Sequence, residues 1–189
     1  MNRYVRAAFV VPFGAAKMMW TKLFHARTFS ASPFCMISFL TEITMDHGAN
    51  LRIGKMLKMR DNSKIRVRKG AECRIGDHVQ IGSGCIIACR GKIEIGSYTE
   101  LGPNVMVFDH DHDFRSPSLA DGKFKTKPIC IGQRVWIGAN AVILRGVSIG
   151  DDAVVGAGSV VTKNIPPRTV YVEKRHGEFI PYNKRGDTE

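Results

Sequence analysis

Residues 131–162 form the most regular part of the chain and read IGQRVW IGANAV ILRGVS IGDDAV VGAGSV VT. An aliphatic residue stands at every sixth position of this stretch, and glycine follows four of these six anchors. Small residues or valine occupy the position four places after each of the first five anchors. A period of six is neither that of an α-helix nor that of a heptad. It matches one short strand plus a corner.

The same period continues upstream, where six more aliphatic anchors are Ile75, Ile81, Ile87, Ile95, Leu101 and Val107. The step from 87 to 95 is eight residues, which indicates a two-residue insertion near Arg90-Gly91-Lys92. Glycine after an anchor permits backbone conformations that a Cβ atom penalises. Three faces of this kind make one coil, and stacked coils bury an aliphatic column that no single coil buries alone. We therefore predict an all-β parallel β-helix, whose handedness does not follow from the period.

The composition argues against several other classes of protein. The chain has 189 residues, a net charge of +11 and five cysteines. No CxxC pair is present and one cysteine is left over, which argues against a disulfide scaffold or structural zinc and favours a reducing compartment. Residues 52–74 carry a net charge of +7 without any aromatic residue between them. Because single-stranded nucleic acids bind by stacking on aromatic rings, we expect no nucleic-acid partner.

The first fifty residues have a different pattern. Arg3 and Arg6 precede a ten-residue apolar run that is too short to span a bilayer. The run resembles a signal peptide, but Pro12 and Gly14 interrupt it. Five apolar residues then recur at helical spacing: Phe13, Ala16, Trp20, Leu23 and Phe24. This spacing predicts a basic amphipathic helix that packs on its own domain, on a neighbouring subunit or, as a peripheral contact, on a membrane surface.

We accordingly expect a helical N-terminal segment over residues 1–50, a β-helix over residues 51–168 and a tail over residues 169–189. The repeat vanishes between the anchors at 107 and 131, so residues 108–128 are expected to form an extruded loop. That loop begins Phe-Asp-His-Asp-His-Asp-Phe at residues 108–114. Loops on rigid scaffolds often carry chemistry.

His110 and His112 are the chemical candidates in this loop. The unperturbed pKa of histidine, about 6.5, suits a base that takes a proton from a hydroxyl group. The neighbouring aspartates, Asp109, Asp111 or Asp113, would fix the imidazole tautomer or remain solvated. A metal site is the competing interpretation, because the two histidines share one side of an extended segment. The other histidines lie outside the motif, so we expect no metal requirement.

The run from Ile129 to Pro167 resembles the C-terminal signature of hexapeptide-repeat O-acetyltransferases, and the similarity covers about residues 70–168. The resemblance implies a left-handed β-helix, an exception among parallel crossovers. It also implies a homotrimer with active sites between subunits and acetyl-CoA as the donor. In that family the catalytic histidine follows the Asn of a Pro-Asn-Val motif by eight residues. Here Asn104 leads to His112, the expected general base, with His110 as the second choice.

Other site residues follow from the same resemblance. Trp136 matches a tryptophan near the acyl end, although packing is an equal alternative for it. Ala139 and Ala157 match the pantetheine channel, and the Ala139 N–H is the expected donor to the thioester oxygen. Thr162 and Lys163 match the edge that receives the nucleotide end of CoA. Asn104 and Asp109 are the expected acceptor-binding residues.

This sequence departs from the family pattern at two places. Residues 170–178 replace the usual Gly-x-Pro-Ala segment near CoA, where Lys174 or Arg175 would have to substitute for a basic residue. Gly82-Ser83-Gly84 stands where the galactoside enzymes place an acceptor-binding asparagine. The acceptor is therefore not expected to be held as a simple galactoside is.

The expected function is acetyl-CoA-dependent O-acetylation of a sugar hydroxyl through a direct ternary complex. The favoured acceptor is a small or lipid-linked precursor of a surface polysaccharide, and the expected location is the cytoplasm, including the inner face of the membrane. One alternative is an N-acetyltransferase acting on a nucleotide-linked amino sugar. The others are a metal-dependent hydratase and a non-catalytic scaffold.

Overall fold

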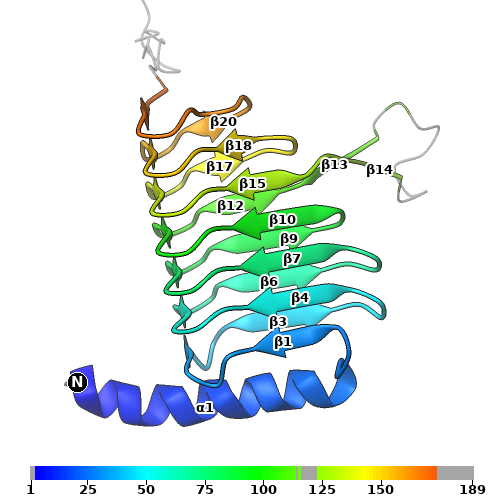
Figure 1. The fold of residues 1–189 in the computed structure, drawn as a ribbon, viewed down its shortest axis with the longest axis vertical. Coiled ribbons are helices and arrows are strands. Elements are labelled where there is room, and N and C mark those ends of the chain that lie inside the picture. Colours follow the sequence, from blue (N-terminus) through cyan, green and yellow to red (C-terminus); the bar gives the residue numbers. More distant parts are fainter. Residues whose placement is uncertain (1–2, 114, 116–122, 174–189) are drawn as a thin grey trace, which may run out of the picture.

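The computed structural model describes residues 3–113, 115 and 123–173, which form one N-terminal helix and a β-helix (Figure 1). Three parallel sheets, here called A, B and C, make up the three faces of the β-helix. Sheet A contains β1 (Phe29–Ala31), β4 (Asn50–Ile53), β7 (Glu72–Ile75), β10 (Lys92–Ile95), β15 (Ile129–Ile131) and β18 (Ser148–Ile149). Sheet B contains β2 (Met36–Ile37), β5 (Lys58–Met59), β8 (Gln80–Ile81), β11 (Glu100–Leu101), β16 (Trp136–Ile137), β19 (Val154–Val155) and β21 (Val170–Tyr171). Sheet C contains β3 (Glu42–Met45), β6 (Lys64–Val67), β9 (Ile86–Cys89), β12 (Met106–Phe108), β17 (Val142–Ile143) and β20 (Val160–Val161).

The coil is left-handed. In Figure 1 the strands of sheet A run from right to left on the near side, and the chain returns behind them through sheet C while it climbs away from the helix. A chain that climbs toward an observer at the top therefore turns clockwise, which is the left-handed sense. The prediction of a hexapeptide-repeat β-helix is confirmed.

The repeat anchors form the core. Ile75, Ile95 and Ile131 stack in sheet A, and each is about 3% exposed. Equivalent columns run through sheets B and C, and the fully buried side chains include Ile81, Leu101, Ile137, Ile87 and Ile143. Burial of one such side chain contributes about 1.5–3 kcal/mol. The stacked columns are thus the main source of stability, and no single coil supplies them alone.

Glycine after an anchor is required by the close stacking of the corners. A Cβ atom on Gly138 would lie 2.5 Å from the backbone nitrogen of Ala157 on the next coil. No neighbouring backbone tolerates such an approach. The glycine phase in the sequence therefore reflects contact between coils rather than flexibility.

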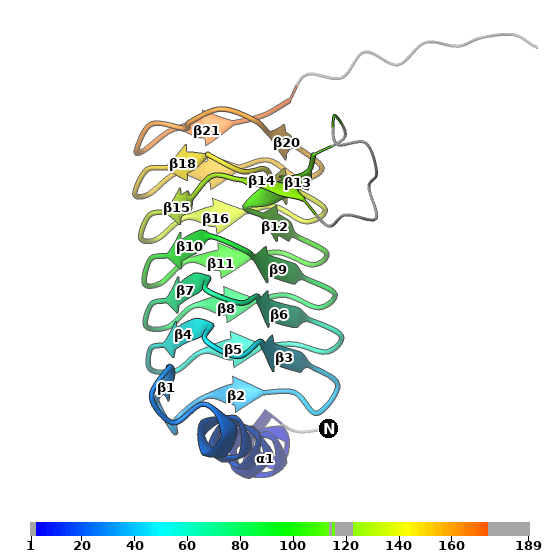
Figure 2. The same ribbon diagram turned by 90° about the vertical axis from the view of Figure 1, so that its right-hand side faces the viewer.

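The N-terminal helix α1 (Arg3–Phe24) lies across the first coil and caps that end of the column (Figures 1 and 2). Met18 is 5% exposed, and the rings of Phe13 and Phe39 lie 4.7 Å apart. A Cβ on Gly14 would approach the carbonyl oxygen of Cys35 to 3.1 Å, so glycine lets the helix settle on β2. The predicted helix thus packs on its own domain. Among the described residues, no helix combines the length and hydropathy needed to cross a bilayer.

The β-helix begins at Phe29 rather than at residue 51, because β1, β2 and β3 pair with β4, β5 and β6. Residues 29–50, which the sequence assigned to the N-terminal segment, form the first coil. Their anchors at 31, 37 and 43 are followed by serine or threonine instead of glycine, which hides the period. At the other end, β21 pairs with β19, so the β-helix also extends into the expected tail.

Candidate active site

A β-hairpin leaves the column between β12 and β15, at the position of the expected extruded loop. Its strands β13 (His110–His112) and β14 (Phe124–Thr126) are antiparallel, with His110 opposite Thr126 and His112 opposite Phe124. The hairpin projects from the corner where the chain passes from sheet C to sheet A (Figures 1 and 2). Because side chains alternate along a strand, His110 and His112 lie on one side of β13 and Asp111 on the other.

Asp109 orients His110. The carboxylate of Asp109 is completely buried, and its Oδ1 lies 2.9 Å from Nδ1 of His110. It also accepts hydrogen bonds from the backbone N–H groups of Arg90, at 2.9 Å, and Gly91, at 2.7 Å. An ionised carboxylate only accepts, so Nδ1 of His110 carries a proton, and in the neutral imidazole the lone pair is on Nε2. The two-residue insertion predicted near Arg90-Gly91 is therefore the turn that holds Asp109.

The thiol of Cys89 contributes to the same arrangement, with Sγ lying 3.5 Å from Oδ2 of Asp109. A hydrogen bond with Cys73, burial and the negative charge of Asp109 raise the pKa of the Cys89 thiol. The thiol therefore stays protonated and donates to the carboxylate. Asp109 is thus satisfied inside the column and does not face a substrate, which corrects its assignment as an acceptor-binding residue.

An aromatic ring joins the two histidines. The ring of Phe124 lies 4.4 Å from that of His112 and 5.4 Å from that of His110. The guanidinium group of Arg90 stacks 3.5 Å above the same ring. His112 is exposed, whereas the side chain of His110 is 15% exposed. The structure thus brings both histidines together and leaves His112 open to a ligand.

The other two aspartates of the motif serve the hairpin. Asp111 accepts from Nε of Arg145 on the β-helix, and Asp113 pairs with Nζ of Lys125 at 2.9 Å. The hydrogen bond from Lys125 lowers the pKa of Asp113. Across the described part of the chain, no three His, Cys, Asp or Glu side chains gather to hold a metal ion.

Three of the expected donor residues lie on sheet B or at the corner that leads from it to sheet C. Trp136 stands on β16 and is 57% exposed, and Ala139 and Ala157 follow β16 and β19 on successive coils. The carbonyl oxygen of Ala139 accepts from Gly158, but within the described residues no acceptor takes up its N–H group. An unused backbone N–H at an open corner suits a group that develops negative charge.

Thr162 and Lys163 lie elsewhere, at the corner between sheets C and A that follows β20. This is the corner from which the hairpin projects, and β20 is two strands beyond β12 in sheet C. The structure therefore places Thr162 and Lys163 above the hairpin on one edge of the column. Trp136, Ala139 and Ala157 lie on another edge, across the width of sheet C.

Asn104 also lies away from the histidines. It occupies the corner between β11 and β12 with a φ of 58°, and its side-chain amide donates to Oδ1 of Asn140 at 3.2 Å. Asparagine tolerates this left-handed conformation better than most residues. Within one chain Asn104 therefore adjoins Ala139 through its neighbour Asn140, not His112.

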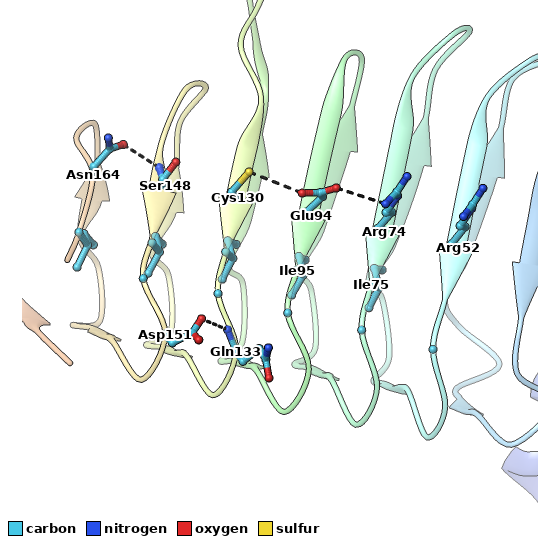
Figure 3. Close-up of a pocket in the computed structure, with 18 of the residues that line it drawn as sticks. Arg52, Arg74, Ile75, Glu94, Ile95, Cys130, Gln133, Ser148, Asp151 and Asn164 are labelled. Atoms are coloured by element: carbon cyan, nitrogen blue, oxygen red, sulfur yellow. Dashed lines mark hydrogen bonds and ion pairs between the residues drawn. The ribbon is translucent and has the colours of Figure 1, made fainter. Parts of the chain in front are cut away.

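One long groove on the surface contains none of the predicted site residues. It has a volume of about 830 Å³ and runs along the outer face of sheet A past Arg52, Arg74, Glu94 and Cys130 (Figure 3). Nη1 of Arg74 lies 3.9 Å from Glu94, which also approaches the thiol of Cys130. Burial, and then the charge of Glu94, raise the pKa of that thiol, so it is not an activated nucleophile.

Sequence reasoning missed Arg90 and Phe124 as members of the site. The insertion that breaks the six-residue period was the available signal for Arg90. Phe124 lies outside the repeat, and nothing in the sequence pairs it with His112; only the hairpin register does so.

Comparison with known proteins supports the repeat and the fold. Residues 128–163 match the model of the hexapeptide repeat of succinyl-transferase. The chain is 38% identical over 101 residues to galactoside O-acetyltransferase of Escherichia coli, covering 53% of this chain and 50% of the relative. The chain therefore carries the hexapeptide repeat and is a homologue of galactoside O-acetyltransferase. It spans about half the length of the curated relatives that it matches.

Solved structures extend the likeness of fold over most of the column. A variant of AntD, an N-acyltransferase from Bacillus cereus in complex with dTDP-4-amino-4,6-dideoxyglucose and coenzyme A, superposes with a TM-score of 0.68 at 20% identity, covering 88% of this chain and 90% of AntD. A GDP-perosamine N-acetyltransferase variant from Caulobacter crescentus gives a TM-score of 0.55 at 20% identity, over 86% of this chain and 64% of the other.

Proposed function

We propose that the protein is an acetyl-CoA-dependent acetyltransferase that modifies a sugar hydroxyl group. The observation that carries this proposal is the hairpin that presents two histidines beside one aromatic ring, at the edge of a column homologous to a galactoside O-acetyltransferase. A thioester and a hydroxyl group need a base and an oxyanion donor to react. The hairpin supplies the base, and the open corner at Ala139 supplies the donor.

His112 is the proposed general base. Its exposed ring reaches a ligand, whereas Nδ1 of His110 is committed to Asp109. His112 takes the proton of the acceptor hydroxyl while the oxygen attacks the acetyl carbonyl of the thioester. The Ala139 N–H stabilises the tetrahedral oxyanion, and collapse of that intermediate breaks the C–S bond. The proton held by His112 then passes to the leaving thiolate, giving free CoA and the acetyl ester.

His110 is the second candidate for the base, and the Asp109 contact favours it. A buried carboxylate that accepts from Nδ1–H fixes the tautomer and the orientation of the ring, so that Nε2 is the atom presented to a substrate. If His112 is the base, the contact between Asp109 and His110 has a structural role instead. It ties β13 to the turn at Arg90-Gly91 and so positions His112.

We propose a homotrimer with the active site between chains. Within one chain the oxyanion donor at Ala139 and the base at His112 lie at different corners, so one chain does not bring them to one acetyl group. A neighbouring column that faces the hairpin with its Trp136–Ala139–Ala157 edge would complete the site. Thr162 and Lys163, on the hairpin edge, would then receive the CoA phosphates.

For the acceptor, we propose a precursor of a surface polysaccharide, acetylated in the cytoplasm. The second candidate is N-acetylation of a nucleotide-linked amino sugar, as the names of AntD and the Caulobacter enzyme describe for those proteins. Their low identity to this chain makes hydroxyl transfer the first choice, because the galactoside enzyme is the more similar in sequence.

A thiol-release assay with acetyl-CoA tests the proposal across paired hydroxyl and amino sugars. The expected loss for His112→Ala is about 10²- to 10⁴-fold in kcat. His47→Ala, an exposed histidine between β3 and β4, is the matched control and should retain full activity. Absence of CoA release with every acceptor would overturn the function. Release that survives His112→Ala but not His110→Ala would transfer the role of base to His110.

A further inference from the structure

The end of the column that α1 covers exposes an unusual amount of apolar surface. Seven of the twelve large exposed hydrophobic side chains among the described residues belong to α1 or the first coil: Met19, Trp20, Leu23, Phe24, Phe34, Phe39 and Leu40. Those of α1 are 66–75% exposed and follow helical spacing, so they form a stripe on the side away from Gly14 and Met18. A stripe of this kind normally has a partner.

Positive charge gathers at the same end. The first acidic residue of the chain is Glu42, whereas five basic residues precede it. Residues 1–74 contain fourteen Lys and Arg and four Asp and Glu, so nearly the whole net charge of +11 lies there. In the second coil the cations occupy all three faces, with Arg52 on sheet A, Lys58 on sheet B and Lys64 on sheet C. The basic residues surround the column instead of marking one side of it.

A polar pocket joins the apolar stripe to this charge. It has a volume of about 330 Å³ and lies where the end of α1 meets sheet A. Three cationic side chains line it, Lys22, Arg27 and Arg52, together with the polar residues Thr28, Ser30 and Asn50. Trp20, Leu23 and Phe24 lie within one helical turn of Lys22. Guanidinium and ammonium groups beside hydroxyl donors suit a phosphate group.

We propose that this end of the protein docks on an anionic phospholipid bilayer. Trp20, Leu23 and Phe24 enter the interface, and the pocket of Lys22, Arg27 and Arg52 faces lipid phosphates. An interfacial helix buries its apolar face about 5–10 Å into the boundary region, and nearby cations add attraction to anionic lipid. The flat placement of α1 across the end of the column (Figure 1) and the charge on all three faces fit a plane better than the side of another protein. This inference does not depend on the proposed reaction.

Tryptophan fluorescence tests the docking directly, because the chain has two tryptophans, Trp20 and Trp136. In the Trp136→Phe variant the emission reports Trp20 alone. We expect a blue shift with vesicles of phosphatidylcholine and phosphatidylglycerol, and quenching by lipids brominated in the acyl chains. No shift with these vesicles would overturn the proposal, as would an equal shift with vesicles of phosphatidylcholine alone.

Vesicle co-sedimentation of the full chain assigns the surface. We expect the triple variant Trp20→Ser, Leu23→Ser and Phe24→Ser to bind anionic vesicles at least about tenfold more weakly. Val170→Ser with Val172→Ser, exposed at the opposite end, is the matched control and should bind as the unmodified chain does. We also expect the double variant Lys22→Glu with Arg27→Glu to bind anionic vesicles about tenfold or more weakly than the unmodified chain. Lys127→Glu should change vesicle binding little.

Two results would contradict this assignment. If the triple variant still binds vesicles, the stripe is not the contact. If the unmodified chain does not bind, while the triple variant has a smaller assembly in light scattering, the stripe is a subunit interface instead. Circular dichroism and unfolding of each variant confirm that the exposed substitutions leave the fold intact.

Discussion

Oδ1 of Asp109 lies 2.9 Å from Nδ1 of His110, and the same carboxylate closes the turn at Arg90-Gly91 through backbone N–H groups. One buried side chain thus fixes both an imidazole tautomer and the junction between the hairpin and the column. The carboxylate belongs to the scaffold and the imidazole to the hairpin, so the fold and the site are linked at this contact.

Asp109→Asn should therefore damage stability and activity together. An amide offers one acceptor oxygen in place of two, which leaves buried N–H groups unsatisfied at a cost of about 1–3 kcal/mol. Urea unfolding measures this loss. Asp113→Asn, which weakens the pair with Lys125 at the surface, is the control and should change stability much less. Equal stability of the two variants would refute the role given to Asp109.

Gly138→Ala should destabilise the column strongly, because its Cβ would lie 2.5 Å from the nitrogen of Ala157. Overpacking of this kind costs about 1–3 kcal/mol or more. Gly91→Ala is the comparison, since its Cβ would meet only ordinary contacts at 3.4 Å and beyond. Thermal unfolding of the two variants should differ clearly, and similar melting temperatures would argue against the stacked-corner explanation.

The ion pair of Glu42 should make the free energy of unfolding depend on pH in the acidic range. The side-chain hydrogen bond from Arg66 is the main cause of the lowered pKa of Glu42, and this pair joins β3 of the first coil to β6 of the second. A lowered pKa means stabilisation that is present above the unfolded value of about 4.3 and is lost as the pH falls through the folded value. Glu42→Gln should therefore be less stable at pH 7, and the difference should shrink near pH 3. Urea midpoints at both values test this, and a difference that is unchanged by acid would contradict it.

Mixed trimers should recover activity lost in each parent. In His112→Ala chains the Ala139 corner is intact, and in Ala139→Asp chains the hairpin is intact. If the site forms between chains, random mixing after refolding produces some interfaces with both intact parts, about a quarter of the total. CoA release from the mixture checks this. Recovery would support the shared site, and a mixture as inactive as both parents would place the site within one chain.

The strict six-residue spacing from Ile131 to Val161 made the β-helix predictable, because each anchor must point inward and each glycine must accept a neighbouring coil. The first coil could not be predicted in this way, because no glycine follows its anchors Ile37 and Ile43. The hairpin could be located because a four-period gap interrupts the repeat.

The partners within the site could not be predicted in the same way. Asp109 binds backbone groups 18 and 19 residues earlier, and only the stacking of coils brings them into contact. The resemblance assigns Ala139 and His112 to one active site between subunits, and the structure places them at different corners of one chain. Local spacing predicts which side chains point inward. Predicting a contact between two coils also requires the number of residues in every turn that separates them.

Each coil of the β-helix adds the same rise along the axis, because neighbouring strands in a sheet are evenly spaced. Sheet C places β12, the strand before the hairpin, three strands beyond β3, and α1 lies beneath the first coil. At about 4.8 Å per strand this is roughly 14 Å of rise above the first coil. A relative with one coil more between α1 and the hairpin would carry the same histidines about 5 Å higher, and one with a coil fewer would carry them lower. The distance between α1 and the hairpin is therefore set in whole coils, and insertions or deletions of a coil are the steps by which it can change.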